Sequence, residues 1–376
     1  MSELNPMATA PYAQNARPFL YGGELEGIAE VLASGQYGHG DVTEQFERAL
    51  ADFLGVDDVV AVASGTAALH IALAVAGIGP GDEVIVPSMT FCATVQAIRA
   101  CGAHPRFAEV DPATLCLRPR DVMDALTPRT RAVLPVLYGG RAVDFSDIRE
   151  ALEEREIVVV EDAAHAFGSY RGTARVGSTR DALTCFSFGP IKTLTCGQGG
   201  ALVPQNPGQA RRARHMRLLG MAESPAERAH NITYHVEGFG LRAHLSQINA
   251  VIGLAQIKHF PALEAQRKEL WRAYAEALDD ATGVLLVDVD VDRSVPTLCA
   301  VRVPDRDQVF TALRDRGIGV GTHYPPNHLQ AAFRRWRRPL LITEQIGNEI
   351  LTLPFHQLMT TDDVRFVAKA VREVLR

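Results

Sequence analysis

A run of four β-branched residues, Ile157–Val160, stands directly before the acidic pair Glu161-Asp162. A continuous apolar run of this kind is typical of a strand that is buried on both faces, as strands are in a parallel sheet covered by helices. Asp162 then lies at the carboxyl end of the strand, where open α/β sheets place their ligands. This one segment therefore predicts an α/β fold with a polar site at one edge of the sheet.

The segments before this strand repeat the same alternation of short apolar runs and amphipathic helices. Helices are expected at 24–34 and 43–54, the second with Asp41 and Glu44 as a capping box and Gly55 as its end. Strands are expected at 59–63, 84–87, 105–110 and 132–138. Such alternation predicts a mostly parallel, doubly wound central sheet flanked by helices.

A chain of 376 residues is long for a single core, which indicates two domains. We place the boundary at Pro261, giving a large domain over 1–260 and a smaller α/β domain over 261–376. Residues 1–15 are expected to form a loose N-terminal arm. The C-terminal part is predicted to hold helices at 262–279, 307–316 and 361–375, and strands at 297–303 and 318–323.

Composition excludes several classes of function. A net charge of −6 argues against a dedicated nucleic-acid binder. No run of about 18 apolar residues and no signal peptide is seen, so we expect no membrane association. The six cysteines lack CxxC spacing and are typical of reduced thiols in a cytoplasmic protein. The twelve histidines form no HExxH or His/Cys cluster, so no metal site is expected.

A lysine, Lys192, follows a second short apolar run (182–188) and opens the glycine-rich stretch Gly189–Gly200. Its neighbours are mainly apolar, and burial would lower its pKa and free the amine as a nucleophile. A lysine and an acid at two neighbouring strand ends are what pyridoxal 5′-phosphate (PLP) requires. The lysine forms a Schiff base with the aldehyde, and Asp162 pairs with the pyridinium nitrogen so that the ring can accept electrons.

Ser64-Gly65-Thr66-Ala67 follows the predicted strand at 59–63 and begins a helical pattern. The exposed N–H groups and the dipole of such a helix start suit a phosphate group. The same residues are also compatible with an ordinary capped helix, so spacing alone leaves the two interpretations open.

Seven segments together resemble one known family. They are SGQYGHGDVTEQFERALADFLGV, SGTAALHIAL, GDEVIVPSMTFCATVQAI, VVVEDAAHAFGS, FSFGPIKTLTCGQGGAL, HYPPNHLQ and LTLPFHQLMTTDDV, in this order along nearly the whole chain. The chain resembles the DegT/StrS family of sugar-nucleotide aminotransferases, which are PLP enzymes of fold type I. The resemblance implies a homodimer with composite active sites, and PLP that passes through its pyridoxamine 5′-phosphate form.

The resemblance also implies roles for individual residues. The catalytic set is Lys192, Asp162 and His165, with His165 near the phenolic oxygen of PLP. The phosphate would be held by Gly65, Thr66, Ala67 and Ser187, the ring would stack on Phe91, and Arg242 matches a residue of the cofactor region. Substrate contacts are expected from Tyr37, His323, Tyr324, Asn327 and His328. For Tyr37 a plain glycine-rich connector is an equal alternative, and for Phe91 so is core packing.

Two positions depart from the family pattern. Gly240 stands where an asparagine usually reaches the PLP phosphate of the partner subunit, and Asn327 stands where leucine is common. Both departures point to an altered substrate. The basic runs Arg211–Arg217 and Arg334–Arg338 could meet a nucleotide diphosphate or form solvated helix faces.

The resulting hypothesis is an aminotransferase that moves an amino group from glutamate or glutamine to a keto group of a nucleotide-linked sugar, in amino-sugar, antibiotic or other secondary-metabolite biosynthesis. Two alternatives remain. The acceptor could be a cyclitol or another non-nucleotide ketone, or the enzyme could be a PLP-dependent dehydratase or cyclase. Some dehydratase relatives carry histidine in place of the lysine, so Lys192 favours amino transfer. A non-enzymatic role is the least supported, because the residues that hold and activate PLP are present.

Overall fold

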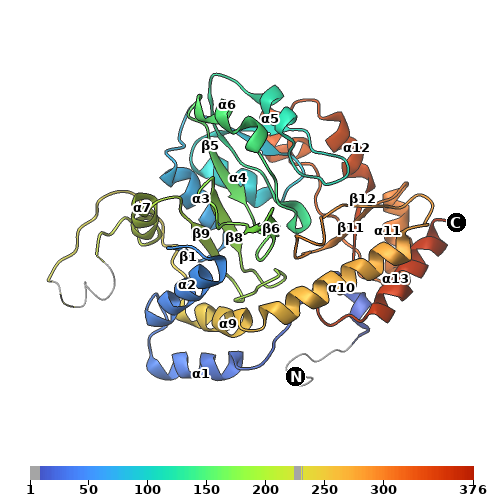
Figure 1. Cartoon of the computed structure of the whole chain (residues 1–376), viewed down its shortest axis with the longest axis horizontal. Coiled ribbons are helices and arrows are strands. Elements are labelled where there is room, and N and C mark those ends of the chain that lie inside the picture. Colours follow the sequence, from blue (N-terminus) through green and yellow to red (C-terminus); the bar gives the residue numbers. More distant parts are fainter. Residues whose placement is uncertain (1–8, 224–229, 231) are drawn as a thin grey trace.

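The computed structural model describes residues 9–223, 230 and 232–376, and its centre is a seven-stranded sheet in the order β1-β9-β8-β5-β4-β2-β3 (Figure 1). Its strands are β1 (Val60–Val62), β2 (Glu83–Pro87), β3 (His104–Ala108), β4 (Thr130–Val133), β5 (Val158–Asp162), β8 (Leu183–Ser187) and β9 (Gly200–Val203). Only β9 runs against the others, because it pairs antiparallel with both β1 and β8. The predicted mostly parallel sheet is thus confirmed.

Helices cover both faces of this sheet. They are α1 (Glu24–Ser34), α2 (Asp41–Leu54), α3 (Gly65–Val75), α4 (Cys92–Ala100), α5 (Pro119–Ala125), α6 (Arg149–Glu153), α7 (Pro207–Arg217) and α9 (Gln247–Ile257). Alternate strand residues point to opposite faces. On β2, Val84 and Val86 share a core with α3, α4 and α7, while Ile85 packs with α5 and α6 on the other face. Doubly wound layering therefore follows from a central strand whose successive apolar residues pack on both faces of the sheet.

The C-terminal part adds a three-stranded antiparallel sheet in the order β10-β11-β12. Its elements are α10 (Phe260–Leu278), β10 (Leu285–Leu286), β11 (Cys299–Arg302), α11 (Arg306–Asp315), α12 (Leu341–Glu349), β12 (Ile350–Leu353) and α13 (Thr361–Val374). Helix α10 begins in the core of the large sheet with Phe260 and ends in the C-terminal core with Tyr274 and Leu278 (Figure 1). The division at 260/261 stays a prediction, and one continuous helix spans it.

Some expected elements differ. The strand predicted at 318–323 does not form; only Gly321 bridges to Thr352 of β12. The strand predicted at 132–138 ends at Val133. Asp41 does not cap α2, because Gly40 is the N-cap and Asp41 is already helical. Alternation of apolar residues marked these stretches, but backbone pairing depends on neighbours that are distant in sequence.

The N-terminal arm is not loose over the part that is described. Tyr12 packs against Phe366 of α13, with ring centroids 4.6 Å apart and the ring planes tilted by 31°. Its carbonyl accepts the N–H of Gly319 at 2.8 Å, and the Asn15 side chain donates to the carbonyl of Thr352 at 2.9 Å. Residues 11–15 are therefore fixed on the C-terminal sheet, which corrects the expectation, while residues 1–8 lie outside the described residues.

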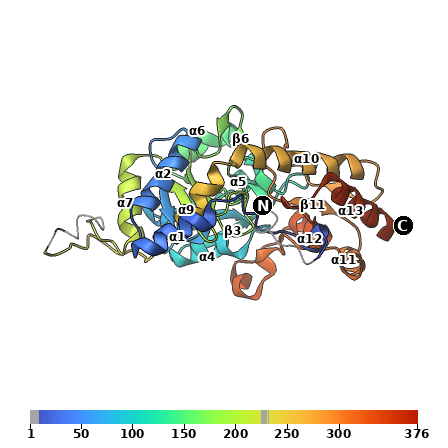
Figure 2. The ribbon, with the colours of Figure 1, turned by 90° about the horizontal axis from the view of Figure 1, so that it is seen from below.

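After α7 the chain extends away from the body of the molecule (Figure 2). Two backbone bridges, Leu218 with Arg242 and Met221 with Val236, pair the outgoing and returning segments as an antiparallel projection. Residues 218–223 and 232–242 are called the hairpin below.

Candidate active site

The site begins at the adjacent ends of β5 and β8. These strands are parallel and pair Asp162 with Cys185, so their carboxyl ends meet at one edge of the sheet. Asp162 is the last residue of β5, and only 6% of the surface of this residue is exposed. Lys192 lies in the turn after β8, where its N–H donates to the carbonyl of Gly189 at 3.1 Å. The sheet thus brings the predicted acid and lysine to the same edge.

The two charges share one buried environment. Burial raises the pKa of Asp162, and this rise is opposed by the Thr94 hydroxyl, the Ala164 N–H and the charge of Lys192. Burial lowers the pKa of Lys192, against the attraction of Asp162. The Lys192 amine is therefore easier to deprotonate than an ordinary lysine, as a nucleophile needs to be.

The start of α3 and the end of β8 form a tight cradle beside the lysine. A Cβ atom on Gly65 would lie 2.7 Å from Cβ of Ser187, so only glycine fits there. A Cβ atom on Gly189 would lie 3.8 Å from Oγ of Ser187 and 3.9 Å from Cγ of Lys192. Gly65, Ser187 and Lys192, predicted from separate motifs, therefore lie next to one another.

The hydrogen bonds of the first turn of α3 decide which amides can hold an anion. The first N–H groups of a helix lack intrahelical acceptors. Oγ of Ser64 accepts the N–H of Ala67 at 3.1 Å, so that amide is already used. The N–H groups of Gly65 and Thr66 have no hydrogen-bond acceptor within the described residues. These two amides and the Ser187 hydroxyl fit a phosphate group.

His165 is held as a neutral ring. The N–H of Gly139 donates to Nδ1 at 3.3 Å, so in the neutral ring the proton resides on Nε2, which lies 3.1 Å from the Tyr324 hydroxyl. Burial, with the charges of Lys192 and His323, holds the pKa of His165 well below its usual range. The ring can therefore donate from Nε2, as an interaction with a phenolic oxygen requires.

The loop from His323 to Tyr324 faces the lysine from the C-terminal part. Both residues line a small cavity together with His165 and Lys192. Burial, with the charge of Lys192, lowers the pKa of His323 to about 4. The ring of Phe91 is exposed, and its centroid lies 5.8 Å from that of Tyr324. Phe91 is therefore not core packing, and it is open to contact a ring placed in the site.

Asn327 and His328 do not reach this cavity. Both side chains are buried, Asn327 donating to the carbonyls of Ser88 at 3.1 Å and Thr90 at 2.6 Å. His328 lies 2.7 Å from the Ser88 hydroxyl and 3.2 Å from Glu344. Their polar atoms are used to hold the turn after β2. The prediction that they contact substrate disagrees with this geometry, because sequence spacing cannot show which way a loop residue points.

Tyr37 and Arg242 lie elsewhere in the chain. The Tyr37 hydroxyl donates to the carbonyl of Leu32 in α1, and its own carbonyl accepts the N–H of Gln247. Arg242 lines a hollow with His39 and His244 at the base of the hairpin. Gly240 lies against the chain, since a Cβ there would come within 2.5 Å of Met216 O and Gly220 N. No asparagine fits at this position with the present backbone.

Several residues of the site were not predicted from the sequence. Thr94 donates to Oδ2 of Asp162 at 2.7 Å, and Tyr138 donates to the carbonyl of His323 at 2.5 Å. Thr297 donates to the carbonyl of His165 at 2.6 Å. The position of Thr94 in the first turn of the helix after β2 could have suggested it, since that turn faces the same sheet edge. Tyr138 and Thr297 gave no such clue.

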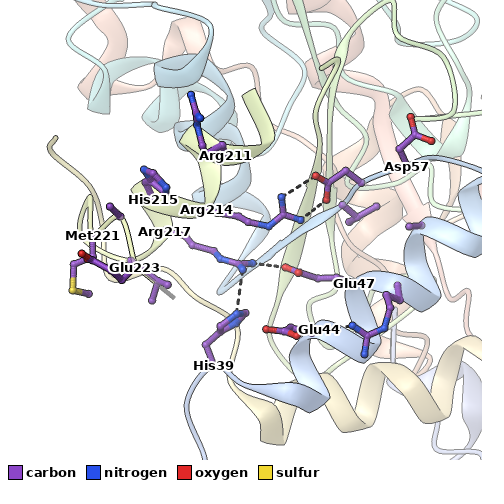
Figure 3. A pocket seen from close by; sticks show the side chains of 16 residues that line it. His39, Glu44, Glu47, Asp57, Arg211, Arg214, His215, Arg217, Met221 and Glu223 are labelled. Carbon is purple, nitrogen blue, oxygen red and sulfur yellow. Dashed lines mark hydrogen bonds and ion pairs between the residues drawn. The ribbon is translucent and has the colours of Figure 1, made fainter. Parts of the chain in front are cut away.

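The basic run Arg211–Arg217 lies in a second cleft, between α7 and α2 (Figure 3). Arg214 forms an ion pair with Asp58, and Arg217 forms one with Glu47 while donating to the carbonyl of Ala61 at 2.7 Å. Arg214 and Arg217 are thus neutralised within the chain and form neither a solvated face nor a free phosphate site. Arg211 and Arg212 are exposed, as the solvated-face alternative predicts for them. The second basic run lies beside edge strand β3, where Trp336 stacks with Arg99 and Arg335.

Neither a metal site nor a membrane span is found in the described part of the chain. Within residues 9–223, 230 and 232–376, no group of three or more His, Cys, Asp or Glu side chains is arranged to hold a metal ion. In the same described ranges, no helix is long and apolar enough to cross a membrane.

The donor set fits PLP. A buried carboxylate, a half-buried lysine of lowered pKa, a neutral histidine donor and a glycine-tight cradle with free amides lie together at the carboxyl edge of the sheet. Asp162 would pair with the ring nitrogen, Lys192 would bind the aldehyde, and Ser187, Gly65 and Thr66 would hold the phosphate. Fold and site together define a PLP-dependent transferase of fold type I.

The comparisons with known proteins specify the family. Residues 21–372 match the model of the DegT/DnrJ/EryC1/StrS aminotransferase family, and the chain belongs to this family. It is 34% identical to S. venezuelae DesV, solved in complex with a ketimine intermediate, with a TM-score of 0.88 over 96% of this chain and 100% of that one. It is also 34% identical to the aminotransferase TlmJ from Streptoalloteichus hindustanus, with a TM-score of 0.88 over 96% and 98% of the two chains.

A further similar structure bears on the cofactor. A putative sugar aminotransferase from Streptococcus pneumoniae has been solved in its PLP form, with 25% identity and a TM-score of 0.88 over 96% of this chain and 97% of that one. The protein is therefore a PLP-dependent aminotransferase that acts on small-molecule substrates, which confirms the predicted family, fold class and cofactor.

Proposed function

We propose that this aminotransferase moves an amino group from glutamate or glutamine to the keto group of a nucleotide-linked 3-keto or 4-keto sugar. The observation that supports this is the juxtaposition of Lys192 and Asp162 in a chain whose full length resembles sugar aminotransferases. A sugar aminotransferase from Micromonospora echinospora also shares 29% identity with this chain over 96% of its length. The expected setting is amino-sugar or secondary-metabolite biosynthesis.

The residues of the site divide the work. PLP, when bound, supplies a ring that accepts the electrons released at the substrate carbon. Asp162 would pair with the ring nitrogen and favour its protonated form. Lys192 would hold the cofactor, and its Nζ would be the group that accepts and returns a proton near the substrate carbon. His165 would donate from Nε2 to the phenolic oxygen, while Phe91, Tyr324 and His323 lie around the space left for the substrate.

The hairpin supports a homodimer with composite sites. Its side chains include Phe239, which is 100% exposed, and Tyr234 and Val236, each 58% exposed. Apolar side chains grouped on a projecting segment mark an interaction surface. The second copy would cover them, and Arg242 and Tyr37, which lie away from Lys192 within one chain, would serve the partner's site. The six unpaired cysteines support a cytoplasmic location.

Two half-reactions test the proposal. Holoenzyme is mixed with glutamate or glutamine alone, and the absorbance of bound PLP is followed as it converts to the pyridoxamine form. The aminated enzyme is then offered a nucleotide-linked keto sugar or a free cyclitol ketone, and return of the PLP absorbance identifies the acceptor. Return with the keto sugar is expected. Failure of every amino donor would instead support the dehydratase or cyclase alternative.

A further inference from the structure

A chain of two buried hydroxyl groups ends on Asp162. Oγ1 of Thr90 lies 2.7 Å from Oγ1 of Thr94, and Oγ1 of Thr94 lies 2.7 Å from Oδ2 of Asp162. The exposed fractions of Thr90 and Thr94 are 2% and 1%. Thr94 belongs to the first turn of α4, which begins at the sheet edge that carries the site. Water therefore has little access to these hydroxyls, and each must bond within the protein.

The number of hydroxyl hydrogens fixes the donor and the acceptor in each of these two hydrogen bonds. An ionised carboxylate only accepts hydrogen bonds, so the hydroxyl of Thr94 must donate its single hydrogen to Asp162. Thr94 must then accept from Thr90, whose hydrogen points toward it. Successive hydrogen bonds of one direction polarise each other, which strengthens the last one. The arrangement as a whole favours the charged form of Asp162.

We propose that Thr94 is a positioning residue that keeps Asp162 charged and aimed at the ring nitrogen of PLP, with Thr90 orienting the Thr94 hydroxyl. The proposal rests on PLP binding by this site and is independent of which keto acceptor is used.

The turn that carries Thr90 is itself fixed from the C-terminal part of the chain. Asn327 donates its side-chain amide to the carbonyl of Thr90 at 2.6 Å and its backbone N–H to the carbonyl of Ser88 at 2.9 Å. Asn327 therefore has a structural role and does not contact the substrate. It holds the turn after β2, and the turn presents Thr90 to Thr94.

The electrostatics agree with the geometry. Burial is the largest influence on Asp162 and raises its pKa, and the Thr94 hydroxyl is the first of the groups that oppose it. Without that hydroxyl, the carboxyl would be more readily protonated in its buried position. A neutral carboxyl would no longer stabilise a protonated ring nitrogen, so the affinity for PLP would fall.

The test compares two cofactors. Dissociation constants for PLP and for 1-deaza-PLP, whose ring has carbon in place of nitrogen, are measured by fluorescence on Thr94→Val, Thr94→Ser and unchanged protein. Loss of a hydrogen bond to a charged group should weaken PLP binding by about tenfold to a hundredfold in Thr94→Val. Binding of 1-deaza-PLP should not change, and Thr94→Ser should restore PLP binding.

Thr184 provides a matched control. It is also buried, and it donates to a buried carboxylate, Glu161, at 2.9 Å on the neighbouring strand. Thr184→Val removes the same kind of bond without touching Asp162, so it should leave both dissociation constants unchanged. Thr90→Val should give a smaller loss for PLP alone, and it keeps the test decisive if Thr94→Val does not fold.

The nitrogen-15 resonance of PLP labelled at the ring nitrogen gives an independent readout. It should report a protonated ring in the unchanged protein and loss of that proton in Thr94→Val. Unchanged PLP affinity and resonance in Thr94→Val would overturn the proposal, and so would equal weakening of PLP and 1-deaza-PLP, which would show that the substitution only disturbs packing.

Discussion

The ion pair between Arg217 and Glu47 is predicted to be a major contributor to stability. It joins α7 to α2, and the exposed fractions of the two side chains are only 3% and 9%. Arg217 also donates to the carbonyl of Ala61 at 2.7 Å, while Glu47 accepts the Ala61 N–H at 2.8 Å, so the pair holds both helices to β1. Replacing Arg217 with methionine keeps most of the volume and leaves a buried carboxylate without its cation.

The burial of the pair determines how much unfolding free energy is lost. Removing one partner of a buried pair costs about 3–5 kcal/mol of unfolding free energy, because the remaining charge is desolvated and uncompensated. Arg214, one turn earlier on α7, offers the control. Its pair with Asp58 is 37% and 30% exposed, so Arg214→Met should cost about 1 kcal/mol or less. Figure 3 shows both arginines extending from α7. The same substitution on the same helix should therefore give very different losses of unfolding free energy.

Urea denaturation of the holoenzyme, followed by circular dichroism, measures both losses. Repeating it at low and high salt separates them further, since salt screens the exposed pair much more than the buried one. The double substitution Arg217→Met with Glu47→Leu should recover much of the stability, because no buried charge remains. Equal losses for Arg217→Met and Arg214→Met, or a loss at Arg217 that salt abolishes, would refute the reasoning.

Three further predictions concern the site and the assembly. Lys192→Ala should abolish the visible absorbance of bound PLP and lower kcat at least about a hundredfold, whereas Lys369→Ala, on the exposed face of α13, should do neither; retained absorbance would exclude Lys192 as the attachment point. The pKa of His323 is about 4 against an ordinary 6.5, so between these values the unfolded chain binds more protons and stability falls as the pH falls. Across that window the unchanged apoprotein should lose about 3 kcal/mol more of its unfolding free energy than His323→Gln does, as measured by unfolding at each pH; parallel curves would contradict this. Phe239→Asp should convert a dimer to monomers in light scattering, whereas Leu341→Asp, at another exposed apolar position, should not; a dimer in both would remove the hairpin from the interface.

Much of the site could be predicted because its residues belong to local patterns. The run Ile157–Val160 can be buried on both faces only within a sheet covered by helices, and Asp162 must then stand at its carboxyl end. Lys192 follows the next parallel strand, and parallel strands end at the same edge. Gly65 and Ser187 also lie at the carboxyl ends of strands of this sheet. Continuous apolar strands and the residues directly after them thus determined the layered fold, the position of the site and the identity of its acid and its lysine.

Only the tertiary structure decided what depends on side-chain direction and on partners distant in sequence. Asn327 faces the turn after β2 rather than the substrate space, and Thr94 reaches Asp162 across 68 positions of the chain. Arg217 is buried against Glu47, although the sequence pattern of its arginine run indicated a solvated helix face. Local periodicity fixes which face of an element is apolar. Whether a polar group meets solvent, a ligand or a buried partner is fixed by elements that pack against it.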